Sequence, residues 1–179
     1  MKPTPKTPAP EHSYKRQIYL GLLFLLLAII AAITIVILPD TPAKQTPKED
    51  FAFTKEGSAF FYNKDGSQKC RFDIEIAETP ESQKQGLMYR DTMAVSQAML
   101  FPYTKPDNLT FWMKNTYLPL DIIFIGADSL IASISANTVP FSEETVSSKA
   151  PAQYVLEINA GLAQKLKLTT GDKFSWTKD

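Results

Sequence analysis

Two acidic residues lie inside apolar stretches of the sequence, and they are the first candidates for chemistry. Asp121 opens the run "DIIFI", and Glu157 lies within "YVLEIN". A carboxylate among apolar side chains needs a partner or a shifted pKa, because burial penalises its charge. Arg90 and Lys114 are the available cations, and such a pair could either fix strand register or hold a ligand. The two carboxylates could also act as acid and base on a glycan.

The segment "FWMKN", which begins at residue 111, places an indole next to a cation and an amide. On an extended chain, Phe111 and Met113 face one way while Trp112 and Lys114 face the other. Asn115 then turns the chain through local side-chain hydrogen bonds. An indole beside a cation suits the floor of a groove that stacks the flat apolar face of a ligand. The alternative is that the indole packs under a neighbouring loop and the cation lies in solvent.

The sequence has few of the residue types that most catalytic and metal sites need. Its single histidine is His12, in the N-terminal region, and its single cysteine is Cys70. A Ser-His-Asp or Cys-His mechanism therefore has no imidazole to use in the C-terminal region. One cysteine can form neither an internal disulfide nor a structural zinc site. We expect no metal and no cofactor, and we expect Cys70 to be a small core residue.

Four methionines lie close together in the sequence: Met88, Met93, Met99 and Met113. Several converging thioethers can select Cu(I). Methionine also fills irregular gaps in small cores, and three of the four have a leucine or a tryptophan beside them. The pattern favours the core interpretation, with the copper site as its alternative.

Alternation of apolar and polar residues predicts several strands. "CRFDIEIA", from residue 70, indicates a strand with one wet face, and the preceding "AFFYNKDGSQ" adds a strand and a turn through Asp65 and Gly66, so the two form a hairpin. "DIIFIG", from residue 121, is apolar on both faces, as a central strand is, and "LIASISA" follows it. "QYVLEIN", from residue 153, alternates again.

Two short helices are expected among these strands. "TPESQKQGLM" offers Thr79 as an N-cap, Pro80 at the first helical position and Gly86 as a stop. "AGLAQKLKL", from residue 160, is the second helix, and "TGDKFSW" closes the chain with an edge strand. About seven short strands and two small helices favour a mainly β (α+β) domain, a compact small barrel or sandwich, over an alternating parallel α/β fold.

An uncharged run of 21 residues, 18–38, precedes this domain. At about 1.5 Å per residue it spans roughly 30 Å, the thickness of the hydrocarbon core of a bilayer. It is longer than the apolar region of a signal peptide and ends in bulky residues, so we expect an uncleaved transmembrane helix. Lys15 and Arg16 abut its N-terminal end, which predicts that the tail, residues 1–17, is cytoplasmic.

The part that follows the apolar run is a linker and then a domain. Residues 39–50 contain three prolines and no periodic apolar residues, which indicates a semi-extended linker. Residues 51–179 then form a β-rich domain on the periplasmic or extracellular side. The expected location is the cell inner membrane, with a single pass, so the membrane is one expected partner.

The distribution of charge argues against nucleic acid as a partner. Residues 1–38 carry four Lys and Arg against one acid, so residues 39–179 carry 15 basic and 18 acidic residues. A protein that tracks a phosphate backbone is basic on at least one face. We expect instead a small molecule or a component of the cell envelope.

Four motifs occur together in this order: "GLMYR" at 86–90, "AMLF" at 98–101, "FWMKNTYLPLDIIFI" at 111–125 and "YVLEINAG" at 154–161. In these motifs the sequence resembles the bacterial and archaeal family called domain of unknown function 192. The resemblance implies a small β-rich domain, often behind a signal or anchor segment, and no established reaction. The family's unusual positions correspond here to Arg90, Trp112, Met113, Asn115, Asp121, Glu157 and Gly161.

Together these patterns predict a membrane-anchored, extracytoplasmic domain that binds a ligand or an envelope component without catalysis. The candidate ligand-binding residues are Arg90, Trp112, Lys114, Asn115, Asp121 and Glu157. Two alternatives stay open. A carboxylate-dependent hydrolase acting on envelope glycan would bring Asp121 and Glu157 together in a cleft. A protein-interaction module assisting membrane complexes would show a flat apolar patch around Trp112.

Overall fold

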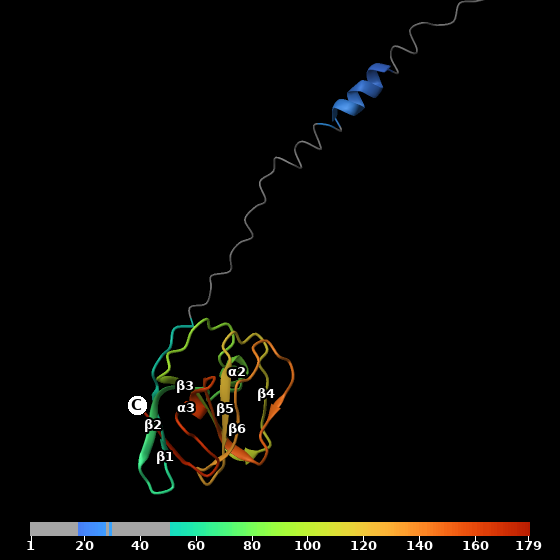
Figure 1. Ribbon diagram of the computed structural model, residues 1–179. Helices are drawn as coiled ribbons and strands as arrows, with labels where there is room; N and C mark the ends of the chain where they lie inside the picture. The colour runs from blue at the N-terminus through green and yellow to red at the C-terminus, as the bar shows by residue number, and fades with distance from the viewer. Residues whose placement is uncertain (1–17, 28, 30–50) are drawn as a thin grey trace, which may run out of the picture. The chain divides into compact units, whose positions relative to one another are not determined.

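The computed structural model describes residues 18–27, 29 and 51–179 (Figure 1). Residues 18–27 are helical. The chain divides at residue 50, and the C-terminal unit contains all the strands that the structure describes. Among the described residues, no helix is both long and apolar enough to cross a membrane.

Much of the predicted N-terminal organisation lies outside the described residues. This holds for the tail, residues 1–17, for the linker, residues 39–50, and for residues 28 and 30–38 of the expected membrane span. The anchor and its topology therefore stay predictions.

The C-terminal unit consists of nine strands and two short helices within the described range. The helices are α2 (Pro80–Gln85) and α3 (Leu162–Lys165). The strands are β1 (Gly57–Tyr62), β2 (Gln68–Ile76), β3 (Gln97–Asp107), β4 (Thr110–Phe111), β5 (Leu120–Ile125), β6 (Ile131–Ser135), β7 (Val146–Ser147), β8 (Ala152–Asn159) and β9 (Lys173–Lys178). A mainly β domain with two small helices is what the sequence predicted.

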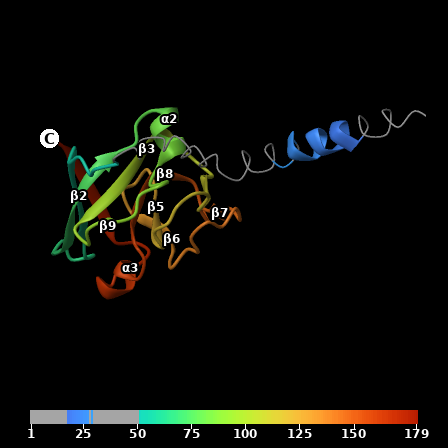
Figure 2. The ribbon, with the colours of Figure 1, turned by 90° about the horizontal axis from the view of Figure 1, so that it is seen from above.

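Seven of the strands form one mixed sheet in the order β6-β5-β8-β3-β2-β1-β9, and β4 and β7 form a separate pair. All neighbours in the large sheet are antiparallel except β2 and β3, which are parallel and joined through α2. Near the two edges of the sheet, Leu130 forms an isolated bridge with Lys173, and backbone hydrogen bonds run from Ile131 N–H to the Asp172 carbonyl at 2.9 Å and from Phe174 N–H to the Ser129 carbonyl at 2.8 Å. The described strands thus form a mixed sheet and no closed barrel, so the barrel form of the predicted compact small barrel or sandwich is not found. Figure 2 shows this sheet from above.

Local signals explain most of these elements. Thr79 caps α2 by accepting the Ser82 N–H at 3.1 Å, and the Ser82 hydroxyl accepts the Thr79 N–H in return at 2.9 Å. Pro80 occupies the first turn, and Gly86 ends the helix with φ +47°. The hairpin of β1 and β2 and the turn through Asp65 are also formed as predicted.

Strand β3 is the element that sequence patterns missed. It includes Pro102 and Pro106, which lack the N–H that a ladder needs and so argue against a strand. The structure accommodates them with a register shift between Pro102 and Asp107 in the pairing with β8. This strand also carries the parallel pairing, because α2 brings the chain back across the sheet.

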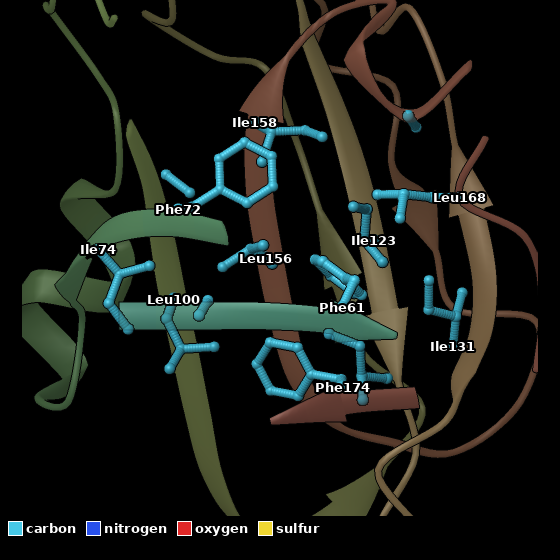
Figure 3. Packing of buried hydrophobic residues seen from close by; sticks show 14 of the residues in the cluster. Phe61, Phe72, Ile74, Leu100, Ile123, Ile131, Leu156, Ile158, Leu168 and Phe174 are labelled. Carbon is cyan, nitrogen blue, oxygen red and sulfur yellow. The ribbon is translucent and has the colours of Figure 1, made fainter. Parts of the chain in front are cut away.

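The large sheet has an apolar cluster on each face. On one face, residues such as Phe61, Leu100, Leu156 and Phe174 pack together from all seven strands of the sheet, and the cluster includes Leu162 of α3 (Figure 3). The second cluster covers the other face, beneath α2 and the β4–β7 pair; its buried members are Ala77, Leu87, Met99, Phe101, Leu109, Met113, Leu118, Leu120, Ile122, Phe124, Ala152 and Val155. Figure 2 shows α2 and α3 on opposite sides of the sheet. The candidate site lies on the second face.

Candidate functional site

A pocket of about 250 Å³ opens on the second face of the sheet. One side is formed by α2 and the turn after it, another by β4, and the base by β3 and β8. Its lining consists of Gln83, Lys84, Gln85, Gly86, Leu87, Met88, Phe101, Tyr103, Thr110, Phe111, Trp112, Thr116 and Glu157. The pocket is therefore walled by aromatic rings and amides, with an acidic residue among them.

Glu157 is the acidic residue of this pocket, and it comes from the middle of β8. Strand register places it opposite Met99 on β3 and Ile122 on β5, so its strand neighbours on this face are apolar. It is 5% exposed, and burial raises the pKa of its carboxyl group from the ordinary value of 4.5 to about 8. Within the described part of the chain, no hydrogen bond or ion pair involves this carboxyl group. The acid is thus buried, unpartnered and in contact with the pocket.

Aromatic side chains form the walls around this acid. Phe101 and Phe111 meet edge to face, with ring centroids 5.1 Å apart. Tyr103 is half-buried on the same face of β3, and its pKa is raised by burial and by the negative charge of Glu157. The interaction with Tyr103 places a phenol hydroxyl within electrostatic range of the carboxyl group.

Helix α2 is positioned tightly against this wall. The Gln83 side-chain amide donates a hydrogen bond to the Pro102 carbonyl at 3.2 Å. Gly86 approaches Phe101 so closely that a Cβ atom there would lie 3.4 Å from the ring. Because Gly86 also has a positive φ, the residue both ends the helix and lets it contact the pocket wall.

Trp112 stands at the rim of the pocket, as the sequence suggested for a groove residue. Its side chain is 42% exposed, whereas Met113 is buried and Phe111 packs against the second cluster. Lys114 Nζ lies 5.3 Å from the centroid of the Trp112 ring, a cation–π contact, and 3.1 Å from Glu143. The two predicted inward residues are thus packed in or against the second cluster and Trp112 is exposed, although Phe111 and Trp112 both line the pocket and the strand β4 ends at Phe111.

Asn115 lies beside the pocket in a row of exposed rings and is not among its lining residues. With φ 55°, it donates a side-chain hydrogen bond to the Tyr89 hydroxyl at 2.7 Å. Tyr89 stacks on Phe51 at 6.4 Å between ring centroids and meets Tyr117 edge to face at the same distance. Tyr117 in turn contacts Phe141 at 5.3 Å. We call these four rings the aromatic row.

Asp121 is buried, as expected, but on the other face of the sheet from Glu157. In the register of β5 and β8, Asp121 pairs with Ile158, the residue next to Glu157, so the two carboxylates point to opposite sides. Its oxygens accept the N–H groups of Asn137 at 2.8 Å and Ala163 at 2.9 Å. These bonds tie β5 to the start of α3, which is a structural role. The two acids therefore do not converge, and the arrangement that the hydrolase alternative requires is not found.

The predicted cationic partners of these acids are wrong. Arg90 Nη1 lies 2.6 Å from Glu75 Oε2, with both side chains about one tenth exposed. Glu75 also accepts the Thr54 N–H at 2.7 Å. Register places Glu75 and Glu157 on the same face, on either side of Met99. The ion pair of Glu75 and Arg90 therefore lies in the same row of the sheet as the pocket acid.

The sulfur-containing residues belong mainly to the cores. Met99 and Met113 are buried in the second cluster, and the Thr138 hydroxyl donates to the Met113 sulfur at 3.2 Å. Met93 packs against the same cluster, and Met88 lines the pocket. Cys70 is partly buried against the first cluster, and burial raises the pKa of its thiol to about 11. This agrees with the core interpretation of these residues.

Sequence reasoning found two lining residues, Trp112 and Glu157, and missed Tyr103, Phe101 and Gln83. The phenylalanine and the tyrosine lie two residues apart in β3, and only that strand brings them to one face. Their alternation was a usable signal, but the prolines between and after them hid the strand. Gln83 could be identified as a lining residue only from the position of α2 against β3 in the structure.

A mixed sheet with a pocket on one face defines a small β-rich domain with a candidate binding site. The family model described as "Uncharacterized ACR", domain of unknown function 192, matches residues 61–176. The chain belongs to this family, as its four motifs indicated. The comparison with curated proteins found no match.

Two solved structures are similar over nearly their whole length. One is a Sinorhizobium meliloti protein described provisionally as a transcription regulator: it is 37% identical, with a TM-score of 0.65, and the alignment covers 70% of this chain and 98% of that one. The other is a Novosphingobium aromaticivorans protein of unknown function: it is 36% identical, with a TM-score of 0.64, and the alignment covers 75% and 99% of the two chains. Both support the fold of the C-terminal unit.

Proposed function

We propose that this protein is a membrane-anchored, extracytoplasmic domain that binds a small ligand or an envelope component in the pocket around Glu157, without converting it. The observation that carries the proposal is the Glu157 carboxyl group, which is buried and unpartnered within the described residues and lines a pocket. The Glu157 oxygens are not among the described side-chain atoms that are both sealed from solvent and without a partner, so they are open to the pocket. A group that enters the pocket can therefore contact them directly.

The shape of the pocket also supports binding of a small molecule. Phe111 and Trp112 supply flat apolar surface, while Gln83 and Tyr103 supply polar atoms at its edges. This combination of aromatic walls and few polar groups is typical of pockets that fix the orientation of a ligand. At about 250 Å³, the pocket suits one small group or the end of a larger molecule.

The membrane part of the proposal rests on the sequence. Residues 18–38 form an uncharged run preceded by Lys15 and Arg16. A linker of residues 39–50, fully extended, reaches at most about 40 Å. The domain would then meet its ligand on the extracytoplasmic side of the membrane.

A binding role is better supported than hydrolysis or nucleic-acid recognition. Asp121 and Glu157 point to opposite faces of the sheet, so they do not form the pair of acids that a glycosidase needs. The description of the Sinorhizobium protein as a regulator carries little weight here. Residues 39–179 have more acidic than basic residues, which opposes binding to a phosphate backbone.

A second candidate function, protein interaction, is favoured by the aromatic row. Tyr89, Tyr117 and Phe141 are each more than 40% exposed and touch one another across two loops. Exposed contiguous rings of this kind occur at protein interfaces. Tyr89 and Tyr117 directly follow the lining residues Met88 and Thr116 in the chain, so the row adjoins the pocket and the two functions could use one face.

A pair of matched variants tests the pocket against the row. Full-length protein is screened by thermal shift against amino sugars, short peptides and amines, and hits are measured again with Trp112→Ala and Phe141→Ala. Both residues are exposed aromatics, but only Trp112 lines the pocket. We expect binding to be lost in Trp112→Ala and kept in Phe141→Ala. The reverse result would reject the pocket and favour the aromatic row.

A further inference from the structure

The pocket combines two features that together recognise one kind of ligand. Its acid, Glu157, has no cationic partner within the described residues. Its walls are the rings of Phe101, Tyr103, Phe111 and Trp112. Aromatic faces carry negative potential and attract ammonium groups, and a carboxylate supplies the counter-charge.

We infer that the pocket binds an organic cation, an alkylammonium group, with Glu157 as its counter-ion and the aromatic walls around its alkyl carbons. This inference rests on the proposed function of the same pocket and names the chemical class of its ligand.

Neither the two cations predicted as partners nor the one that lines the pocket pairs with Glu157 in the described structure. Arg90 pairs with Glu75 at 2.6 Å, and Lys114 pairs with Glu143 at 3.1 Å. Lys84 lines the pocket but is exposed to solvent on α2. The positive charge that would stabilise ionised Glu157 must therefore come from a ligand, or the acid must retain its proton. An anionic ligand would meet a buried acid, and the exposed Lys84 is the one cation among the described lining residues that could pair with it.

Trp112, at the rim of the pocket, already makes a cation–π contact with a side chain of the protein. The ammonium group of Lys114 lies 5.3 Å from the Trp112 ring centroid. A ligand ammonium deeper in the pocket would meet more rings and less water, and cation–π attraction strengthens as the cation is desolvated. The small volume, about 250 Å³, favours an ammonium head group on a short chain over a larger cation.

Binding of such a cation must depend on pH, because it requires the ionised form of an acid that otherwise keeps its proton. Burial raises the pKa of Glu157 to about 8, so affinity should fall as the pH drops below that value. From pH 8 to pH 6 the ionised fraction falls by about 50-fold, and affinity with it. The other titratable groups lining the pocket are Tyr103, whose pKa is raised further above this range, and Lys84.

The test uses the full-length chain with Trp176→Phe, which leaves Trp112 as the single tryptophan. Emission of Trp112 is titrated with n-butylammonium, n-butanol and butyrate at pH 6, 7 and 8. We expect n-butylammonium to bind about 50-fold more tightly at pH 8 than at pH 6. At pH 8 it should bind at least tenfold more tightly than n-butanol. Glu157→Gln should remove both differences, while Glu144→Gln, an exposed acid, should leave them unchanged.

The possible failures are distinguishable. If n-butanol or butyrate binds as tightly as n-butylammonium at pH 8, the pocket binds ligands but not as a cation site, and only this inference is overturned. If n-butylammonium binds with the same affinity at pH 6 and pH 8, Glu157 is not its counter-ion. If none of the three probes binds at any pH, both the inference and the binding function of the pocket fail.

Discussion

Replacing Glu157 with glutamine should stabilise the protein at neutral pH. In the unfolded chain this acid ionises near 4.5, whereas in the folded chain burial raises its pKa to about 8. Between these values the unfolded state binds fewer protons, so stability falls as the pH rises. Each pH unit in this window is worth about 1.36 kcal/mol, so the penalty at pH 7 is roughly 3 kcal/mol and at pH 4 close to zero. Glutamine keeps the shape of the protonated acid and has no proton to lose.

The assay is urea unfolding of wild type, Glu157→Gln and Glu144→Gln from pH 4 to pH 8. The difference between wild type and Glu157→Gln isolates this acid from the other titrating groups. It should grow from near zero at pH 4 to roughly 3 kcal/mol at pH 7 in favour of the variant. Glu144 is exposed, so its substitution should shift stability by less than about 0.5 kcal/mol. Equal pH slopes for wild type and Glu157→Gln would refute the reasoning.

Three further predictions concern the surroundings of the pocket. Arg90→Met should lower stability by roughly 3–5 kcal/mol in urea unfolding, because it leaves the buried Glu75 without its partner; an effect below about 1 kcal/mol would mean that the pair is open to water. Gly86→Ala should cost about 1 kcal/mol, since φ is +47° and the new Cβ would contact Phe101; a stabilised variant would argue against the close approach of α2. Trp112→Ala should lower the melting temperature less than Phe111→Ala, because only the phenylalanine packs into the second cluster; equal losses would make Trp112 a core residue.

Local patterns predicted the elements whose signals are complete within the segment. The capped helix after Thr79 and the alternation of β8 are examples, because caps and period-two patterns need no distant partner. Strand β3 was missed because Pro102 and Pro106 argue against a ladder, and only a register shift across the sheet accommodates them. The parallel pairing of β2 and β3 depends on how the connection through α2 crosses the sheet. No local sequence pattern indicates the path of that connection.

The sequence could point to the unusual residues of the site, but it could not show which of them lie together in the folded domain. Trp112 and Glu157, which the sequence singled out as an indole beside a cation and an acid in an apolar strand, both line the pocket. Asp121 was wrongly joined to Glu157, because a shift of one residue in register decides which face a side chain occupies. Glu75 lies on the predicted wet face of its strand, yet it is 7% exposed and paired with Arg90.

The central claim is that the buried acid Glu157 is the group that contacts the ligand. Measuring the pKa of Glu157 tests this claim most directly. The carboxyl ¹³C shift of Glu157 is followed by NMR in the full-length chain, with Glu157→Gln to assign the signal, first alone and then with n-butylammonium. We predict a midpoint near pH 8 in the free protein and a lower midpoint with the ammonium present. A midpoint near 4.5 in the free protein, unchanged by n-butylammonium, would contradict the account.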